Sequence, residues 1–489
     1  MPPATTEKPD RSVLETEILL DRGDAFPVGG MPDEPVIDLP HDAGDPNAPM
    51  TQKRVLGLAV PIIGENLLQT LVGAIDTFMV ARLGSIAVAG VGTSVELIFF
   101  LISMLSAVEI GATVLVSQAI GAGDTAKANQ LARQALSWGV LLAIPVSFFG
   151  VFVAPHVIRL YGAEPAVADA AVVYLEIIAA TSVALLLSFV CSAVLRGAGD
   201  SRTPLYAAMV ANVINIVAAY GLIFGNFGLP ALGIAGSAWA ASLGRAVAAA
   251  IMIGLMVRGH RKISLRGREG WMPHFEIGRS LMRLGVPAAI EQMLISAGFA
   301  TMMGVVAFIG TAALAAQQIG FTALSLAFLP GFGFAIATTA LVGQSVGANN
   351  WEAARKAQQI GLRWGVLWMA CGSVVYFFFG RQIMHLFTSD PEVIEQGVRA
   401  LRALSIALPF WGIGFVSSGA LRGSGDTRTP AFISASSVWV AVALAWFAVH
   451  YIRPDLGLVW STFVITSPIS GLLAWALFRR RMASLHHQP

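Results

Sequence analysis

The chain has 489 residues, of which 56% are apolar and only 12% are charged, and its formal net charge is +2. A soluble domain carries about 25% charged residues, so this composition excludes a chain whose whole surface faces water. The mean hydropathy of +0.71 points to lipid-facing surfaces instead. Cys191 and Cys371 both lie inside apolar runs, so no disulfide framework is indicated.

The first fifty residues differ in composition from the rest of the chain. They contain eleven acidic residues, three basic residues and nine prolines, so their charge of −8 leaves +10 on the other 439 residues. Such a segment buries too little apolar surface to offset the entropy lost on ordering. We predict a disordered acidic cytoplasmic tail over residues 1–50 without a signal peptide. A binding role is the alternative to a simple solvated extension.

From Val55 onward, apolar stretches alternate with short polar or glycine-rich breaks. A bilayer core of about 30 Å is crossed by about 20 helical residues, so each stretch can span it. The stretches are continuously apolar, which favours helices over a barrel. Twelve spans are predicted, at approximately 55–81, 88–119, 132–157, 168–195, 204–225, 232–257, 278–306, 312–343, 357–379, 396–421, 429–451 and 456–478.

The basic residues are distributed unequally between the breaks. With the amino terminus inside, the inner segments hold twenty-one Lys and Arg residues, whereas the outer breaks hold four. This bias predicts a multi-pass protein of the cell membrane with both termini in the cytoplasm. The longest basic break, residues 257–274, is the natural linker between two halves.

Several segments of the chain recur after 226 residues. LRGAGDSRTP at 195–204 returns as LRGSGDTRTP at 421–430 with eight of ten residues identical, and residues 116–140 match 342–366 with nine identities in 25. Pro61 and Glu65 map onto Pro287 and Glu291 at the same offset. We therefore expect two homologous halves of six helices. Because six is even, both halves share one topology, as in transporters whose parallel repeats flank a central cleft.

The fold class that follows is an all-α integral membrane protein with twelve transmembrane helices in two pseudo-twofold-related six-helix bundles flanking a central cleft. We expect it to be a monomer with no nucleic-acid partner. The predicted boundaries are an N-terminal lobe over 51–257, a cytoplasmic basic linker over 258–277, a C-terminal lobe over 278–480 and a cytoplasmic tail over 481–489.

The repeated decapeptide is predicted to shape two inner turns. Its glycines can end one helix and its threonines, Thr203 and Thr429, can cap the next, with a proline at the first helical position. A phosphate-binding loop is disfavoured because the motif ends a helix rather than following a strand, and because it lacks the lysine. The structural candidates are Arg196, Gly197, Gly199, Asp200, Arg202, Pro204, Arg422, Gly423, Gly425, Asp426, Arg428 and Pro430.

These motifs resemble those of the multidrug and toxic compound extrusion (MATE) family. IDTFMVARLG at 75–84 matches the family's opening signature, the decapeptides follow the fourth and tenth spans, and VSQAIGAGD and VGQSVGANN follow the second and eighth. The resemblance covers about 430 residues, everything except the tail. It implies a secondary antiporter, not an enzyme, that exports small organic and often cationic compounds while sodium or protons enter the cell. No cofactor or metal is expected.

Inserting an acidic side chain at membrane depth costs at least about 2.5–3.5 kcal/mol. We therefore expect each such residue to have a structural or functional role. Glu65 lies eleven residues past Arg54, about 16 Å along a helix, and Asp76 lies eleven residues further. Eleven steps of about 100° return to nearly the same face, so Glu65 and Asp76 should face the same space. Asn66 and Gln69 are near that stripe and are candidates for a substrate cleft. The alternative places Asp76 near the outer interface, where it is merely solvated.

The resemblance places ion coupling in the N-terminal half. It implies that Asp76 takes part in cation or proton coupling and that Asn215 belongs to the family's cation site. Glu65 and Glu291 are symmetry mates, and both a coupling role and a structural packing role are open for them. The ion-coupling candidates are thus Asp76, Glu65, Asn215 and Glu291.

The chain also departs from the family pattern. Ala219 and Ala241 replace oxygen-bearing residues of the cation site, although Ser242 follows directly. Trp411 and Met302 replace aspartates of the second half, and both are candidate contacts for an organic substrate. Sodium needs several hard oxygen ligands, whereas a proton needs one acid, so we favour a proton over sodium as the coupling ion.

Arg245, a mid-depth cation of the sixth span, is expected to need a counterion, with Glu109 or Glu176 as candidates. A flippase for lipid-linked precursors, from the same fold superfamily, is the alternative function. It would need several basic residues in its cleft, and only Arg245 lies mid-membrane. An enzyme would need histidines or similar groups at depth, but all eight histidines lie at span ends, in linkers or in the tails. A channel would not need two unequal halves.

Overall fold

The computed structural model describes residues 49–160, 164–260, 262–267 and 270–486. The acidic segment 1–50 therefore lies outside the described residues, apart from its last two positions. Within the described ranges every regular element is a helix, except for one isolated bridge between His260 and Ile263. The predicted all-α fold class is confirmed.

The N-terminal half contains six spans, two of which are interrupted. A π-helical segment joins α4 to α5 within one span, and α6 and α7 form another span that bends by 53°. The elements are α2 (Gln52–Ala81), α3 (Ser85–Gly121), α4 (Thr125–Phe148), η2 (Phe149–Val153), α5 (Ala154–Leu160), α6 (Pro165–Ala180), α7 (Ser182–Gly197), α8 (Arg202–Phe224) and α9 (Ile234–Arg258).

The C-terminal half contains six unbroken helices. With the bent pair taken as one span, the described helices provide the twelve predicted spans. The last helix continues to His486, beyond the predicted end of the lobe at residue 480. The elements are α10 (Phe275–Ala307), α11 (Thr311–Gly347), α12 (Trp351–His385), α13 (Pro391–Gly423), α14 (Arg428–Tyr451) and α15 (Leu456–His486).

The two halves differ in the middle of their fourth span. In the N-terminal half the helix breaks at Thr181, whose hydroxyl donates to the Ile177 carbonyl at 2.8 Å and lies 2.6 Å from the Ser242 hydroxyl. A threonine hydroxyl bonded to its own helix competes with the backbone ladder and bends the helix. The equivalent position in the continuous α13 is Ala407, which has no hydroxyl.

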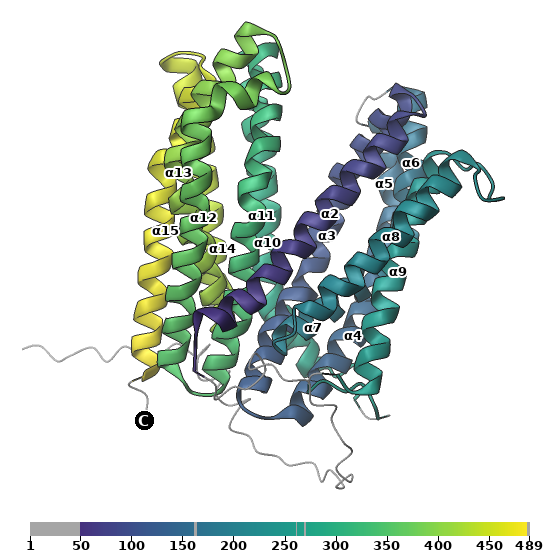
Figure 1. Ribbon diagram of the computed structural model, residues 1–489, viewed down its shortest axis with the longest axis vertical. Helices are drawn as coiled ribbons and strands as arrows, with labels where there is room; N and C mark the ends of the chain where they lie inside the picture. The colour runs from purple at the N-terminus through teal and green to yellow at the C-terminus, as the bar shows by residue number, and fades with distance from the viewer. Residues whose placement is uncertain (1–48, 161–163, 261, 268–269, 487–489) are drawn as a thin grey trace, which may run out of the picture. The chain divides into compact units, whose positions relative to one another are not determined.

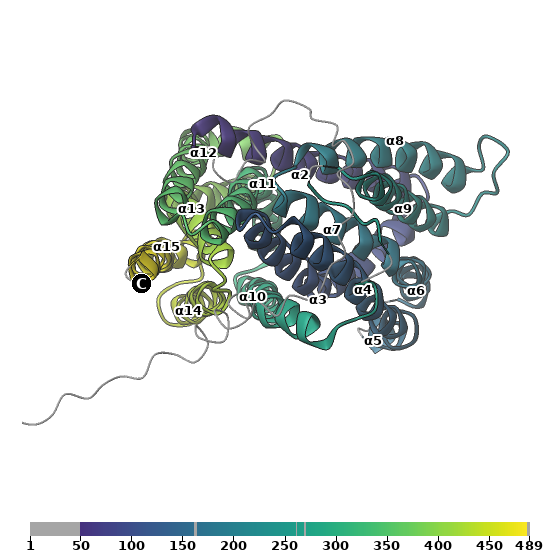
Figure 2. The ribbon, with the colours of Figure 1, turned by 90° about the horizontal axis from the view of Figure 1, so that it is seen from below.

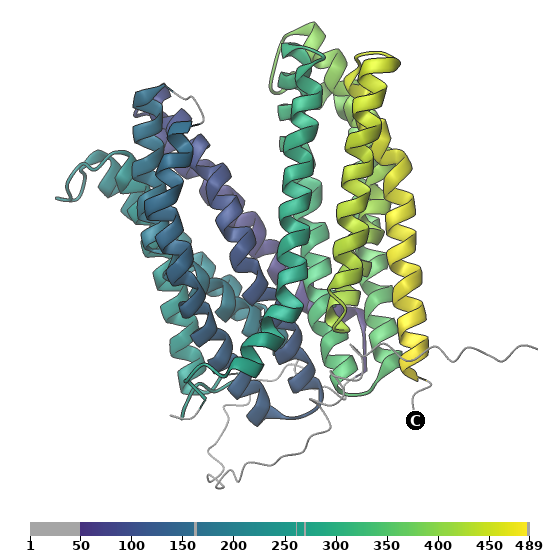
Figure 3. The ribbon, with the colours of Figure 1, turned by 180° about the vertical axis from the view of Figure 1, so that it is seen from behind.

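The helices gather into two bundles, α2–α9 and α10–α15, as Figure 1 and Figure 3 show. Each bundle has its own apolar core, with Leu105 and Leu186 in the first and Leu404 and Phe463 in the second. The first helix of each half packs against both bundles. In the N-terminal half, α2 contacts α8 of its own bundle and α11 of the other. In the C-terminal half, α10 contacts α14 of its own bundle and α3 of the other. We call the end of the bundles that carries the two decapeptides the motif end, and the opposite end the far end.

The decapeptide forms the turn between α7 and α8. Gly199 has φ +91°, in the left-handed region that favours glycine, so a glycine ends the helix as predicted. The predicted threonine cap is wrong, because Asp200 accepts the backbone N–H of Thr203 at 3.1 Å and its hydroxyl as well. The helix begins at Arg202, so Pro204 is its third residue rather than its first. The second copy repeats this arrangement at Gly425, Asp426, Thr429 and Pro430.

Candidate functional site

Asp76 on α2 and Asn215 on α8 form a polar pair inside the N-terminal bundle. The side-chain nitrogen of Asn215 donates to Asp76 Oδ2 over a long 3.5 Å. Asn215 is buried and Asp76 is half-buried. The Oδ1 atom of each side chain is buried and has no hydrogen-bond partner among the described residues. The pair therefore holds two unsatisfied acceptors, which a proton or a cation would satisfy.

Arg245 on α9 is the cation of this region. It lies within electrostatic range of Asp76 and of Tyr174 on α6. The predicted counterion was Glu109 or Glu176, but Glu109 instead forms an ion pair with Arg196. Asp76 is the acidic residue whose charge acts on Arg245.

The positions that depart from the family pattern provide few oxygen ligands for a cation near Asp76. Ala219 and Ala241 are both buried apolar residues. The hydroxyl of Ser242 donates to the Ala238 carbonyl at 2.9 Å and contacts the Thr181 hydroxyl at the α6–α7 bend. This hydroxyl therefore already has two protein partners.

A second charged cluster lies nearer the motif end. The Arg196 guanidinium, at the end of α7, donates to Glu65 Oε2 at 2.8 Å and to Glu109 Oε1 at 3.3 Å. The side chains of Arg196 and Glu65 are only 8% and 5% exposed, whereas that of Glu109 is 26% exposed. One guanidinium therefore balances two carboxylates, and the cluster keeps one excess negative charge when both are ionised.

The C-terminal half repeats part of this cluster at the 226-residue offset. Arg422 at the end of α13 donates to Glu291 Oε2 on α10 at 2.7 Å, and the Glu291 side chain is 4% exposed. The mate of Glu109 is Ala335, which carries no charge. The excess carboxylate is therefore a property of the N-terminal half.

Glu65 and Asp76, which the sequence places on one face of a helix, do not form a shared cluster. Eleven residues separate them by about 16 Å along α2, and their side chains meet different helices. Glu65 pairs with Arg196 of α7, whereas Asp76 pairs with Asn215 of α8. Between these positions on α2, Asn66 is half-buried and Gln69 is exposed.

The two candidate substrate contacts of the C-terminal half have different surroundings. Met302 is 0% exposed in the apolar core, so it lies inside the bundle and not on the surface of a cleft. Trp411 is half-buried and stacks edge-on against Phe328 and Phe463. It belongs to a connected aromatic cluster of eight rings: Phe299, Phe321, Phe328, Phe332, Trp411, Phe415, Trp460 and Phe463.

The two bundles are joined at the motif end by a reciprocal pair of hydrogen bonds. Gln118 at the end of α3 donates to the Gly423 carbonyl of the other bundle at 3.1 Å, and Gln344 at the end of α11 donates to the Gly197 carbonyl at 2.9 Å. Arg54 also donates to Gln344 Oε1 at 3.1 Å. Figure 2, a view from below, shows α3, α7 and α11 converging in this region.

Glycines allow the backbones of this joint to touch. A Cβ at Gly121 would lie 1.9 Å from the Gln344 carbonyl oxygen, and a Cβ at its mate Gly347 would lie 2.0 Å from the Gln118 carbonyl oxygen. We call Gln118, Gln344 and these glycines the clasp. The clasp is not among the predicted site residues, although Gln118 and Gln344 are identical in the aligned segments VSQ and VGQ. The described residues hold no group of three or more His, Cys, Asp or Glu side chains that could bind a metal.

Known proteins share both the sequence pattern and the fold. The MatE family model matches residues 61–221 and again 287–447, so its two matches begin 226 residues apart. The "Probable multidrug resistance protein NorM" of Thermotoga maritima is 32% identical over 445 residues, covering 89% of this chain and 92% of that protein. The "Uncharacterized transporter YisQ" of Bacillus subtilis is 26% identical over 431 residues, covering 88% and 94%.

Solved structures agree with this relationship at the level of the fold. The "Outward-facing conformation of a multidrug resistance MATE family transporter of the MOP superfamily" has a TM-score of 0.84 and 22% identity, covering 91% of this chain and 98% of that one. A MOP superfamily transporter from Pyrococcus furiosus has a TM-score of 0.83 and 22% identity over the same shares. The family model matches both six-helix halves of the chain. The chain belongs to the MATE family, whose members are membrane transporters and not enzymes.

Proposed function

We propose that this protein is a multidrug efflux antiporter of the cell membrane, which exports small amphipathic organic cations in exchange for protons. The motif end faces the cytoplasm in this proposal, because the inner breaks carry most of the basic residues. The relationship to multidrug resistance proteins of the NorM type supports efflux of organic compounds. The Asp76–Asn215 pair supports the proton as the coupling ion.

The coupling step follows from the hydrogen bonds of this pair. A proton on Asp76 turns one carboxyl oxygen into a donor, and Asn215 Oδ1 is an acceptor without a partner among the described residues. Loss of the proton restores the full attraction between Asp76 and Arg245. Protonation therefore changes the relative stability of contacts among α2, α8 and α9, and so can shift a conformational equilibrium. A sodium ion would need more hard oxygen ligands than Ala219 and Ala241 provide.

Glu65 and Glu291 act as structural anchors in this proposal. Each glutamate side chain is almost fully buried and forms an ion pair with the arginine that ends the fourth span of its half. Neither glutamate therefore belongs to the Asp76–Asn215 pair. A buried ion pair loses much stability when one partner is removed. These pairs therefore hold the first and fourth spans of each half together while the bundles move.

The clasp gives alternating access a defined closed state. The hydrogen bonds of Gln118 and Gln344 close the motif end, and breaking them is required before the bundles separate there. In this state the substrate leaves and the proton enters from the far end. Substrate binding from the cytoplasm requires the clasp to open.

The chemistry of the two bundles favours amphipathic cations as substrates. Asp76 supplies a negative charge in the N-terminal bundle, and the eight-ring cluster supplies aromatic faces in the C-terminal bundle. Phe332 of this cluster is 42% exposed, so part of the aromatic surface is accessible. Aromatic faces attract organic cations.

A flippase for phosphate-bearing lipids fits this arrangement poorly. Such a protein needs cationic side chains that are available to phosphates. Arg245 lies within range of Asp76, and Arg196 and Arg422 are held by buried glutamates. Arg196 and Arg422 are therefore already paired with carboxylates, and the charge of Arg245 acts on Asp76 within the same bundle.

Transport by the purified protein in liposomes tests the proposal. Ethidium serves as the cationic probe, and a neutral dye of similar size serves as the comparison. We expect a pH gradient alone to drive ethidium against its concentration gradient, and a sodium gradient of equal size to be ineffective. Transport driven by sodium without a pH gradient would overturn proton coupling. Equal transport of the neutral dye would overturn the preference for cations.

A further inference from the structure

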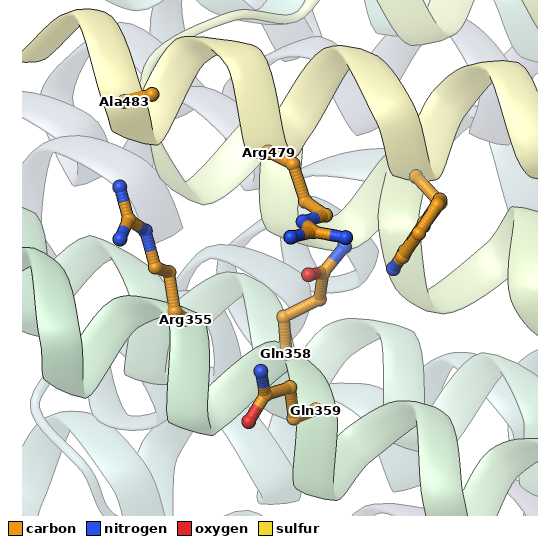
Figure 4. A pocket seen from close by; sticks show the side chains of 6 residues that line it. Arg355, Gln358, Gln359, Arg479 and Ala483 are labelled. Atoms are coloured by element: carbon orange, nitrogen blue, oxygen red, sulfur yellow. The ribbon is translucent and has the colours of Figure 1, made fainter.

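A cavity of about 490 Å³ lies between α12 and α15 at the motif end of the C-terminal bundle. Figure 4 shows Arg355 extending from α12 toward α15, and Arg479 extending from α15 toward Gln358 of α12. The two guanidinium groups therefore enter the same space from opposite walls. The lining residues are Arg355, Gln358, Gln359, Trp475, Arg479 and Ala483.

The two arginines of this cavity have no acidic partner among the described residues. Neither Arg355 nor Arg479 has a carboxylate within ion-pair distance in the described part of the chain. The Arg479 guanidinium instead stacks over the Trp475 ring, 4.9 Å from its centre. Gln358 is buried and donates to Ser417 Oγ at 3.4 Å, which holds its amide at the cavity wall. Two guanidinium groups beside amide donors are suited to a phosphate.

The equivalent corner of the N-terminal bundle is filled by the chain itself. The mate of Arg355 is Asn129 on α4, whose side chain accepts the backbone N–H of Ser264 in the linker at 2.7 Å. Gln134 on α4 donates to two further linker carbonyls at 2.6 Å each. Ile263 and Leu265 of the linker are buried in the same core. In the C-terminal bundle no described segment covers this corner, and arginine stands where the first half has Asn129.

An apolar surface continues from the cavity along the bundle. Ile465, Ile469 and Leu472 follow one another at helical spacing on α15 before Trp475, and they are 58%, 64% and 48% exposed. Such a stripe on a membrane span faces acyl chains, and a tryptophan at its end is typical of the membrane interface. The cavity therefore sits where an acyl surface meets a cationic site, which is the arrangement of a phospholipid and not of a soluble anion.

We propose that this corner binds the headgroup phosphate of an anionic phospholipid, with the acyl chains lying along Ile465, Ile469 and Leu472. Arg355 and Arg479 bind the phosphate from the two walls, and the small side chain of Ala483 leaves room for it. The lipid takes the structural place that the linker takes in the first half. Phospholipid binding does not depend on which ion drives transport, so it can be measured without a transport assay.

Native mass spectrometry of the purified full chain tests the proposal, with dioleoyl phosphatidylglycerol compared against dioleoyl phosphatidylcholine. We expect one phosphatidylglycerol to bind in preference to phosphatidylcholine. Arg355→Gln and Arg479→Gln should each weaken this binding roughly fivefold, as expected for one basic residue at an anionic lipid surface. Ala483→Leu should weaken it as well, because it fills the cavity and keeps both charges.

Arg480→Gln is the matched control, because it removes the same charge from the exposed neighbouring residue, which does not line the cavity. It should leave phosphatidylglycerol binding unchanged. An equal loss in Arg480→Gln, or equal binding of both lipids, would overturn the proposal by showing non-specific attraction. Displacement of the lipid by millimolar inorganic phosphate would also overturn it, by assigning the cavity to a free anion.

Discussion

Gln118 and Gln344 occupy equivalent positions of the two repeats, and each donates its side-chain amide to the carbonyl of the last helical glycine in the other bundle. The duplication has thus produced a joint with twofold symmetry. Because both donors lie at the same end, the joint ties the bundles together there and leaves their far ends without this restraint. The position of these bonds makes them a natural control point for access from the cytoplasm.

The clasp should set how often the motif end opens. Each hydrogen bond contributes about 1 kcal/mol, so Gln118→Ala with Gln344→Ala should raise the population of the open state by up to roughly 30-fold. Spin labels at Ala126 and Glu352, exposed symmetry mates at the motif end, would report this as a longer distance in pulsed electron resonance. Cys371→Ala removes the exposed native cysteine from the background.

Gln382→Ala, an exposed glutamine at the other end of α12, is the matched control and should leave the distance unchanged. An unchanged distance in the double alanine variant would contradict the role of the clasp.

The Arg196 cluster should matter more for stability than for coupling. Arg196→Gln leaves the buried Glu65 and the half-buried Glu109 without their cation, so we expect a loss of about 3–5 kcal/mol in the free energy of unfolding. Glu65→Gln should be milder, because Arg196 keeps Glu109 at 3.3 Å. Adding Glu65→Gln to Arg196→Gln should recover part of the lost stability. Thermal unfolding of the purified variants measures this order.

Transport separates this structural role from a coupling role. Glu65→Gln should still move ethidium in response to a pH gradient, at a rate that follows the amount of folded protein. A Glu65→Gln protein of normal stability that no longer responds to the pH gradient would show that Glu65 carries the proton.

Asp200 should make the motif end sensitive to acid. Burial opposes its ionisation, but hydrogen bonds from His260 and Thr203 outweigh burial and hold the pKa of Asp200 below its ordinary value of 3.8. A carboxyl with a lowered folded pKa stabilises the fold above its ordinary pKa, and this contribution is lost as the pH falls through the folded value. The melting temperature should therefore drop below about pH 4.

Asp200→Asn should lower the free energy of unfolding by about 1–3 kcal/mol near pH 7 and should flatten its decline in acid. Asp169→Asn, an exposed carboxylate on α6, is the control and should keep the acid profile of the natural protein. Identical acid profiles for Asp200→Asn and the natural protein would argue against the lowered pKa.

The helical fold was accessible from sequence because its signals are local and repeated. Apolar stretches of span length predict helices, and the recurrence of Pro61 and Glu65 at Pro287 and Glu291 predicts the duplication. The bend at Thr181 was not predictable in this way. It depends on a hydroxyl that bonds both its own helix and Ser242 of α9, a contact between residues 61 positions apart.

The site was predictable only in part. Periodicity along α2 places Glu65 and Asp76 on one face, but it says nothing about which helix each side chain meets. The decapeptide pattern predicts that Arg196 belongs to an inner turn, whereas its side chain reaches Glu65 across 131 positions of sequence. A usable signal was present, because Glu65 and Arg196 both recur at the 226-residue offset as Glu291 and Arg422.

Asp76→Asn gives the most direct test of proton coupling, measured as ethidium transport into liposomes under an imposed pH gradient. The side chain keeps its size but can no longer exchange a proton, so we expect the pH gradient to lose its effect while ethidium still binds. Asp169→Asn, with the same chemical change at an exposed position, should transport normally. Full pH-driven transport by Asp76→Asn would contradict the proposal that this residue couples the proton to export.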